Sequence, residues 1–163
     1  MIVASGLSGL VLLAILVAIT VADIRHRRIP DLLNLLLGVA GMATRIVAEG
    51  RVPFASVVAG LVAAGLLWAV AATFRHLRGM VGLGMGDVKM IGVAAIWISP
   101  WNLPLLLAIA CLTALLGVAV AALSGQGPNK HTRIPFGPFL GLGLMLTWGL
   151  EVSGGPTLEL SGM

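Results

Sequence analysis

The stretch LSGLVLLAILVAITVAD, residues 7–23, carries no charged side chain until its last residue, Asp23. It belongs to an apolar run over residues 2–22, and roughly 20 such residues are enough for a helix to cross the hydrocarbon core of a bilayer. A secretion signal has a shorter apolar core behind a basic leader, and this run has no basic leader. We therefore expect residues 2–22 to form a retained membrane helix.

The rest of the chain has the same character. Hydrophobic residues make up 59% of the 163 residues and charged residues only 10%, whereas soluble domains carry about 25% charged residues. Five more apolar runs follow, separated by proline, glycine or charge, at residues 32–48, 53–74, 88–99, 103–123 and 136–151. The sequence predicts an all-α polytopic membrane protein, with one domain over residues 1–163 and about six transmembrane helices.

The basic residues predict how the chain is oriented. Eight of the ten fall on one side of the predicted membrane: Arg25, Arg27, Arg28, Arg75, Arg78, Lys89, Lys130 and Arg133. Arg45 and Arg51 fall on the other side. The positive-inside rule places the first side in the cytoplasm and both termini outside. Orientation accounts for the net charge of +4, so we expect no nucleic-acid partner.

The tryptophans and the single cysteine lead to two further expectations. Trp97, Trp101 and Trp148 fall near the predicted outer helix ends, where an aromatic belt would lie. Cys111, in the middle of the fifth run, excludes a disulfide framework or a cysteine zinc cluster within one chain. We interpret Cys111 as a small buried apolar residue.

Two aspartates lie at the ends of apolar runs. A charge at the centre of a membrane helix costs about 2.5 to 3.5 kcal/mol, and such residues usually mark function. Asp23 follows the first run and Asp87 precedes the fourth, so two crossings return the chain to the same face. The two carboxylates can therefore meet on the cytoplasmic side. Structural alternatives are neutralisation of Asp23 by the nearby arginines and helix capping by Asp87, and we expect Asp31 to cap the second helix.

The fourth run is too short to cross a bilayer. Its 12 residues, 88–99, would span about 18 Å as a helix, against roughly 30 Å of hydrocarbon. We therefore expect Asp87 to lie below the membrane surface, with residues 80–86 as irregular backbone around a wet pocket. Gly84 and Gly86 would permit positive φ angles or close approach of a substrate. Lys89 is favoured as an interfacial, snorkelling lysine; pairing with a carboxylate or a lipid phosphate is the alternative.

Three segments together resemble a known family. They are DIRHRRIPD at residues 23–31, GMGDVK at residues 84–89 and IPFGPFLG at residues 134–141. In this order they resemble the motifs of the prepilin peptidases, which are intramembrane aspartic proteases with a G-x-G-D motif. The family often has asparagine where this chain has Asp31, so this chain offers two acids near the first helix, and we keep Asp23 as the catalytic one.

The resemblance implies a function and a site. The chain would cleave the basic leader from type IV pilin-like precursors, which carry an apolar helix, at the cytoplasmic face of the inner membrane. Asp23 and Asp87 would be catalytic. The residues that shape the site or bind substrate would be Gly84, Gly86, Lys89, Pro135, Gly137 and Pro138.

The resemblance also implies what the reaction requires. It implies that the reaction needs no cofactor and no metal. It also implies that lipid surrounds the protein, and it is compatible with a homo-oligomer. The family's larger members also methylate the new amino terminus and carry paired cysteines that this chain lacks. We expect peptidase activity alone, as in the short forms that serve Flp or tight-adherence pili.

Hydrolysis by two carboxylates needs one ionised group and one protonated group. The helix dipole favours the anion of Asp87, so we expect Asp87 to be the ionised partner.

Three other functions stay open on the sequence alone. A metal hydrolase could use Asp23 and His26, at helical i, i+3 spacing, with His76 and His131. A small proton- or cation-coupled transporter could also place two carboxylates near helix ends. A membrane scaffold could use the glycines at residues 137–143 simply to pack helices closely, and we expect these glycines to have that packing role in any case.

Overall fold

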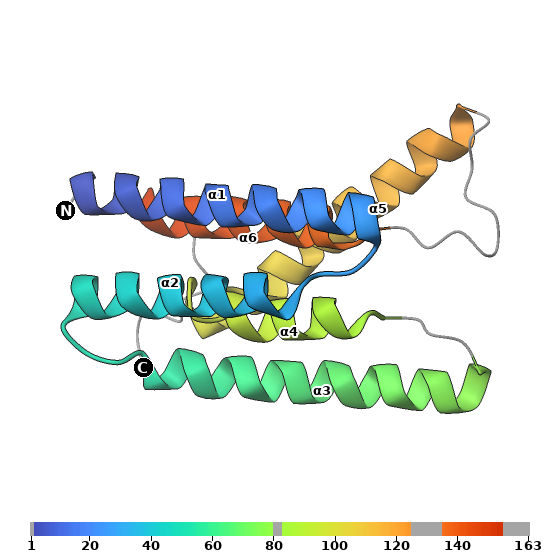
Figure 1. The fold of residues 1–163 in the computed structure, drawn as a ribbon, viewed down its shortest axis with the longest axis horizontal. Coiled ribbons are helices and arrows are strands. Elements are labelled where there is room, and N and C mark those ends of the chain that lie inside the picture. Colours follow the sequence, from blue (N-terminus) through green and yellow to red (C-terminus); the bar gives the residue numbers. More distant parts are fainter. Residues whose placement is uncertain (1, 80–82, 125–134, 155–163) are drawn as a thin grey trace.

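The computed structural model describes residues 2–79, 83–124 and 135–154, with side chains from residue 6 onward. Every regular element in these ranges is a helix, which confirms the all-α prediction (Figure 1). The elements are α1 (Ile2–His26), α2 (Asp31–Glu49), α3 (Phe54–Arg78), α4 (Met85–Ala94), the 3₁₀ helix η1 (Pro100–Asn102), α5 (Leu103–Leu123) and α6 (Gly137–Val152). Lys130, His131 and Arg133 lie outside the described residues.

Helix lengths support a multi-pass membrane protein. Four segments are long and apolar enough to cross a bilayer: Gly6–His26, Asp31–Glu49, Phe54–Arg78 and Pro100–Leu123. Helix α6 is apolar but has 16 residues. Helix α4 has ten residues, which extend about 15 Å and cannot span a bilayer. The six predicted runs thus correspond to six α-helices in the described ranges, and the fourth is the short one.

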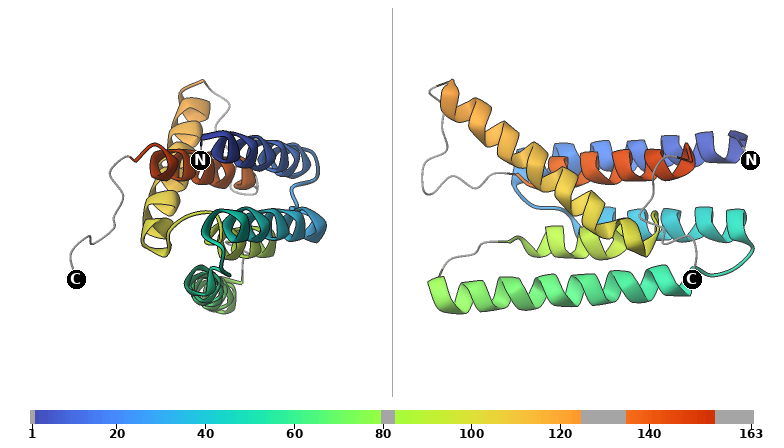
Figure 2. Two further views of the ribbon diagram at one scale, coloured as in Figure 1. Left: turned by 90° about the vertical axis from the view of Figure 1, so that its left-hand side faces the viewer. Right: turned by 180° about the vertical axis from the view of Figure 1, so that it is seen from behind.

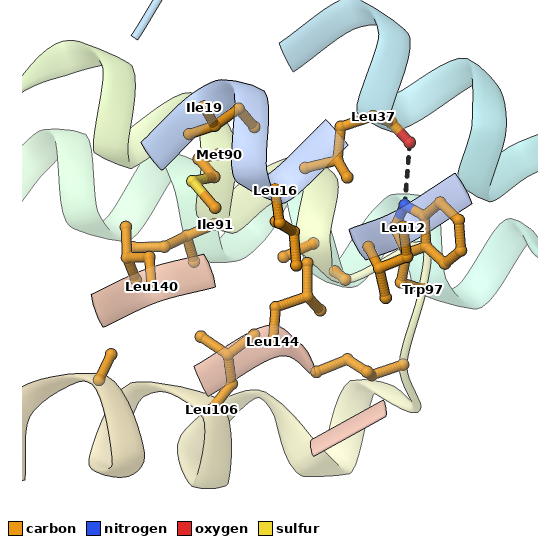
Figure 3. Packing of buried hydrophobic residues seen from close by; sticks show 14 of the residues in the cluster. Leu12, Leu16, Ile19, Leu37, Met90, Ile91, Trp97, Leu106, Leu140 and Leu144 are labelled. Atoms are coloured by element: carbon orange, nitrogen blue, oxygen red, sulfur yellow. Dashed lines mark hydrogen bonds between the residues drawn. The ribbon is translucent and has the colours of Figure 1, made fainter. Parts of the chain in front are cut away.

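Helix α4 lies at the centre of the fold. It packs against α2, α3 and α6, while α1 lies beside α6 (Figures 1 and 2). Four of its ten residues are buried, among them Met90 and Ile91, which meet Leu140 and Leu144 of α6 and residues of α1 in one core (Figure 3). Because three helices surround α4, all its residues except Met85 and Lys89 are at least partly buried. Helix α5 crosses the bundle obliquely, and its C-terminal part projects away from the other helices (Figure 1).

Glycines set the closest helix contacts. A Cβ atom added to Gly60 of α3 would lie 2.1 Å from the carbonyl oxygen of Gly92 in α4. A Cβ atom on Gly143 of α6 would lie 2.7 Å from the carbonyl oxygen of Leu106 in α5. Small residues let helix backbones approach within the membrane. The contact at Gly143 agrees with the packing role expected for residues 137–143.

The expected aromatic belt is wrong for Trp97, which is 3% exposed. Its indole Nε1 donates a hydrogen bond of 2.9 Å to the carbonyl oxygen of Leu37, and its ring lies over Gly41, where a Cβ atom would approach Nε1 to 2.6 Å (Figure 3). Trp101 is exposed and Trp148 is partly buried against the core. Cys111 is exposed on α5, so its interpretation as a buried residue is also wrong.

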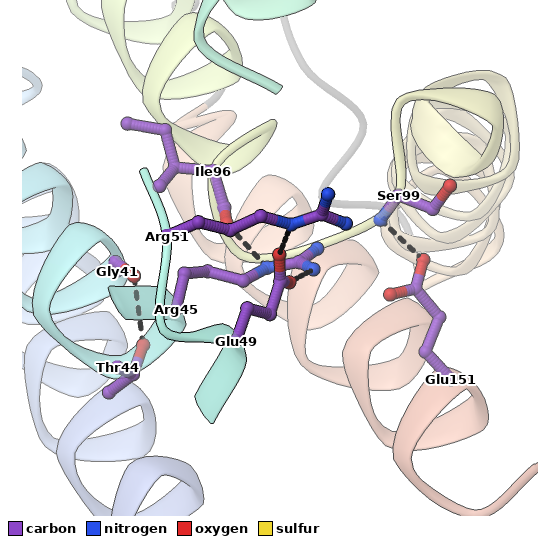
Figure 4. A network of polar contacts seen from close by, with 8 residues as sticks. All are labelled: Gly41, Thr44, Arg45, Glu49, Arg51, Ile96, Ser99 and Glu151. Atoms are coloured by element: carbon purple, nitrogen blue, oxygen red, sulfur yellow. Dashed lines mark hydrogen bonds and ion pairs between the residues drawn. The ribbon is translucent and has the colours of Figure 1, made fainter. Parts of the chain in front are cut away.

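A polar network holds the end of the bundle where α2 and α6 finish (Figure 4). Arg45 donates through Nε to the carbonyl oxygen of Ile96 at 3.1 Å and pairs with Glu49. Glu151 of α6 accepts hydrogen bonds from the backbone N–H of Ser99 at 2.7 Å and from Asn102 at 2.5 Å. These contacts fix the segment between α4 and α5. They leave the opposite end of α4, where Asp87 lies, to be positioned by other residues.

Candidate active site

Asp23 lies in the last turn of α1 and is 5% exposed. Helix α1 ends where Arg27 adopts a left-handed conformation (φ 51°), with its N–H bonded to the carbonyl oxygen of Asp23 at 2.8 Å. The carboxylate oxygen Oδ2 accepts a hydrogen bond of 2.8 Å from the backbone N–H of Gly137. Arg25, Arg27 and Arg28 are exposed, and no ion pair of the described residues joins them to Asp23. A helix N-terminus, and not an arginine, therefore stabilises this carboxylate.

Gly137 is the first residue of α6 and lies against Asp23. A Cβ atom at Gly137 would be 2.8 Å from Oδ2 of Asp23 and 3.2 Å from its Cγ, so any other residue would collide with the carboxylate. Pro138 follows in the first turn of α6, where the absence of an N–H does no harm because that group has no partner within the helix. Pro135 lies just before the helix and is partly buried.

Asp87 is the third residue of α4. Gly84 is the N-cap, and its backbone N–H donates to the Asp87 carboxylate, which is half of a capping box. The structural alternative for Asp87 thus holds in part: the N-cap residue is Gly84, and the Asp87 carboxylate accepts a backbone N–H at the helix N-terminus. A Cβ atom on Gly84 would lie 2.7 Å from Oδ2 of Asp87. The helix begins at Met85, so Met85 and Gly86 are not part of an irregular segment as expected, and residues 80–82 lie outside the described ranges.

Gly86 brings the start of α4 against the connection between α1 and α2. A Cβ atom on Gly86 would lie 3.0 Å from Cβ of Ile29, and Nδ2 of Asn34 donates to the carbonyl oxygen of Gly86 at 3.3 Å. Neither Gly84 nor Gly86 has a positive φ. The glycines are therefore not needed for a positive φ angle, and close approach is the reason that holds. Gly84 lies close to the Asp87 carboxylate, and Gly86 lies close to the segment between α1 and α2.

The two carboxylates lie at the same end of the bundle, where α1 ends and α4 and α6 begin (Figure 1). Asp87 belongs to α4, which is not among the membrane-spanning segments. Burial, followed by the charge of Asp23, raises the pKa of Asp87 to about 6, and the Gly84 N–H opposes this shift. The expectation that the helix dipole makes Asp87 the ionised partner is therefore not supported, because burial outweighs the helix terminus.

The sequence comparisons agree with this geometry. Residues 10–120 match the type IV leader peptidase family. The chain belongs to this family.

The sequence similarity to named relatives covers most of the chain. A prepilin leader peptidase/N-methyltransferase of Aeromonas salmonicida is 33% identical over 151 residues, covering 90% of this chain and 51% of that protein. The protein of that name in Xanthomonas campestris is 30% identical over 157 residues, covering 92% and 53%. The one in Neisseria gonorrhoeae is 33% identical over 135 residues, covering 82% and 45%. The chain thus spans about half the length of these relatives. No solved structure matches it.

Asp31 is the second acid near the end of α1, and its carboxylate is bound to a lysine. Asp31 is the first residue of α2, its N-cap is Pro30, and no side chain caps the helix, so the predicted capping role is wrong. Its Oδ1 accepts a hydrogen bond of 2.7 Å from Nζ of Lys89. Lys89 therefore pairs with a carboxylate, and the favoured snorkelling interpretation is wrong. The carboxylate whose charge raises the pKa of Asp87 is that of Asp23, not that of Asp31.

Two features of the site were not visible in the sequence analysis. Asn34 is buried in α2 and contacts the backbone beside Asp87. Its side-chain amide within the apolar run 32–48 could have indicated a role in the site. The backbone N–H of Gly137 has no sequence signal beyond the glycine itself. Among the described residues, no three His, Cys, Asp or Glu side chains are grouped to hold a metal ion, and His131 lies outside them.

Proposed function

We propose that this chain is an aspartic endopeptidase of the inner membrane that removes the basic leader from type IV pilin-like precursors. The observation that supports the proposal is that α1 and α4 carry Asp23 and Asp87 at the same end of the bundle, where the charge of Asp23 helps to raise the pKa of Asp87. Family membership supports the same reaction. The excess of basic residues at that end favours a cytoplasmic site, with both termini outside.

The proposed mechanism divides two tasks between the carboxyl groups. Asp23, which accepts the Gly137 N–H, is the ionised partner. It takes a proton from a water molecule while the oxygen of that water attacks the scissile carbonyl carbon. Asp87, with its raised pKa, donates its proton to the carbonyl oxygen. The resulting diol collapses: the C–N bond breaks, the amine nitrogen takes a proton from Asp23, and Asp87 recovers its own. No covalent intermediate is required.

Two finer features belong to the same proposal. The precursor serves an Flp or tight-adherence pilus, as the resemblance to short forms implies. The chain does not methylate the new amino terminus, because it has a single cysteine, on α5, and cannot supply the paired cysteines of the larger family members. Incubation of the cleaved product with labelled S-adenosylmethionine tests the second feature, and transfer of label to the product would exclude it.

The deciding experiment is cleavage of an Flp-type precursor in membranes by wild type and by three variants. Asp23→Asn and Asp87→Asn should each abolish cleavage, because each removes one of the two required acids. Asp31→Asn is the matched control and should cleave normally, since Asp31 pairs with Lys89 at the surface. Full cleavage by either of the first two variants would refute the assigned pair.

A further inference from the structure

A groove of about 550 Å³ lies between α2, α3 and α4. Its walls are apolar and include Val39, Leu61 and Val93, and glycines at positions 38, 60 and 92 also line it. Helices α2 and α3 are membrane-spanning segments whose large apolar side chains are widely exposed, so the groove faces lipid. We call it the α2–α3–α4 groove. An apolar helix can enter it sideways from the bilayer.

One end of the groove is polar and lies near the start of α4. Asn34 and Lys89 both line it. Lys89 follows Asp87 by two residues, and Asn34 donates to the carbonyl oxygen of Gly86, the residue just before Asp87. The polar end of the groove thus lies at the end of α4 that carries Asp87. A helix lying along the groove would have one of its ends there.

Asn34 provides a second, independent observation. The residue is 4% exposed, yet its oxygen Oδ1 has no hydrogen-bond partner among the described residues. A buried acceptor without a partner costs free energy that an incoming N–H group would recover. The first four N–H groups of any helix lack partners within that helix. The N-terminus of an apolar helix would therefore offer the donor that Asn34 lacks.

We propose that the α2–α3–α4 groove binds the apolar helix of the precursor, with the N-terminal N–H groups of that helix facing Asn34. This inference rests on the proposed function and adds the surface that recognises the substrate. The precursor has its leader before its apolar helix, so the start of the helix lies next to the scissile bond and next to Asn34. An apolar helix laid in an apolar groove is a common mode of recognition. A lipid chain would fill the apolar walls but offers no N–H group at this depth.

Filling the groove tests the proposal. Leu61→Trp places a bulky ring in the groove from a side chain that is 70% exposed, and Leu112→Trp makes the same change on α5 from a side chain that is 64% exposed. Leu61→Trp should raise KM for the precursor about tenfold, equivalent to roughly 1.4 kcal/mol of binding, with kcat within about twofold of wild type. Leu112→Trp should match wild type. Equal KM values for all three proteins would overturn the inference and leave the proposed function standing. A wild type that cannot cleave the precursor would overturn both.

Cross-linking identifies the occupant directly. A precursor with one cysteine in the first turn of its apolar helix is combined with Asp87→Asn protein, so that the precursor stays intact. The test protein also carries Val39→Cys and Cys111→Ala, and the control retains only its native Cys111, exposed on α5. A precursor adduct should form with the test protein and not with the control. Adducts only between two copies of this chain, adducts of equal yield at Cys111, or no precursor adduct would each exclude the precursor helix as the occupant.

Discussion

Replacing Gly137 by alanine tests the site at its tightest point. The added methyl group would lie 2.8 Å from Oδ2 of Asp23 and 3.2 Å from its Cβ and Cγ. Separations under 3.0 Å are not tolerated, so α6 or the carboxylate must move. That movement breaks the 2.8 Å hydrogen bond from the Gly137 N–H to Oδ2.

The size of the effect follows from that bond. Hydrogen bonds to charged groups contribute about 1.5 to 3 kcal/mol, so the loss in kcat/KM should be roughly 10- to 150-fold if the bond serves catalysis. The assay is the time course of precursor cleavage in proteoliposomes. Gly149→Ala is the control on the same helix, because no atom lies within 4 Å of its added methyl group. Cleavage by Gly137→Ala at more than half the wild-type rate, or an equal loss in Gly149→Ala, would refute the reasoning.

Three further predictions follow from the same contacts. Gly84→Ala should also lose cleavage at least tenfold, since its methyl group would lie 2.7 Å from Oδ2 of Asp87, while Gly65→Ala, with no atom within 4 Å, should cleave normally. The raised pKa of Asp87, about 6, predicts that kcat/KM falls as pH rises through that value, because the proton that Asp87 must donate is lost; a flat profile from pH 5 to 8 would contradict its role as the acid. Trp97→Phe should lower the free energy of unfolding by about 1 to 3 kcal/mol in detergent, by removing the indole hydrogen bond to the Leu37 carbonyl and leaving a gap in the core, whereas Trp101→Phe should change it little.

The general architecture was predictable because a bilayer allows few structures. Backbone groups in lipid must be bonded within their own segment, so each long apolar run had to become a helix. The number of crossings then determined which loops share a face. That reasoning placed Asp23 and Asp87 at the same end without any knowledge of the packing.

Burial within the protein was not predictable from hydropathy. In a membrane, an apolar side chain is equally compatible with lipid and with a neighbouring helix, so composition gave no means of distinguishing the buried Trp97 from the exposed Cys111. Long-range polar pairs were equally hidden. The contact between Lys89 and Asp31 joins residues 58 apart, and nothing local in either segment specifies it.

The glycines of the two motifs explain how the fold accommodates two carboxylates at one end of the bundle. Each acid accepts a backbone N–H from a helix N-terminus: Asp23 from Gly137 of α6, and Asp87 from Gly84 at the start of α4. Helix N-termini favour negative charge, which offsets part of the cost of burying each acid beside the other. Each N–H can approach so closely only because a glycine provides it, since a Cβ atom at either position would lie within 3.0 Å of the carboxylate. The glycines at positions 84 and 137 are therefore explained by the carboxylates that they contact, independently of any substrate.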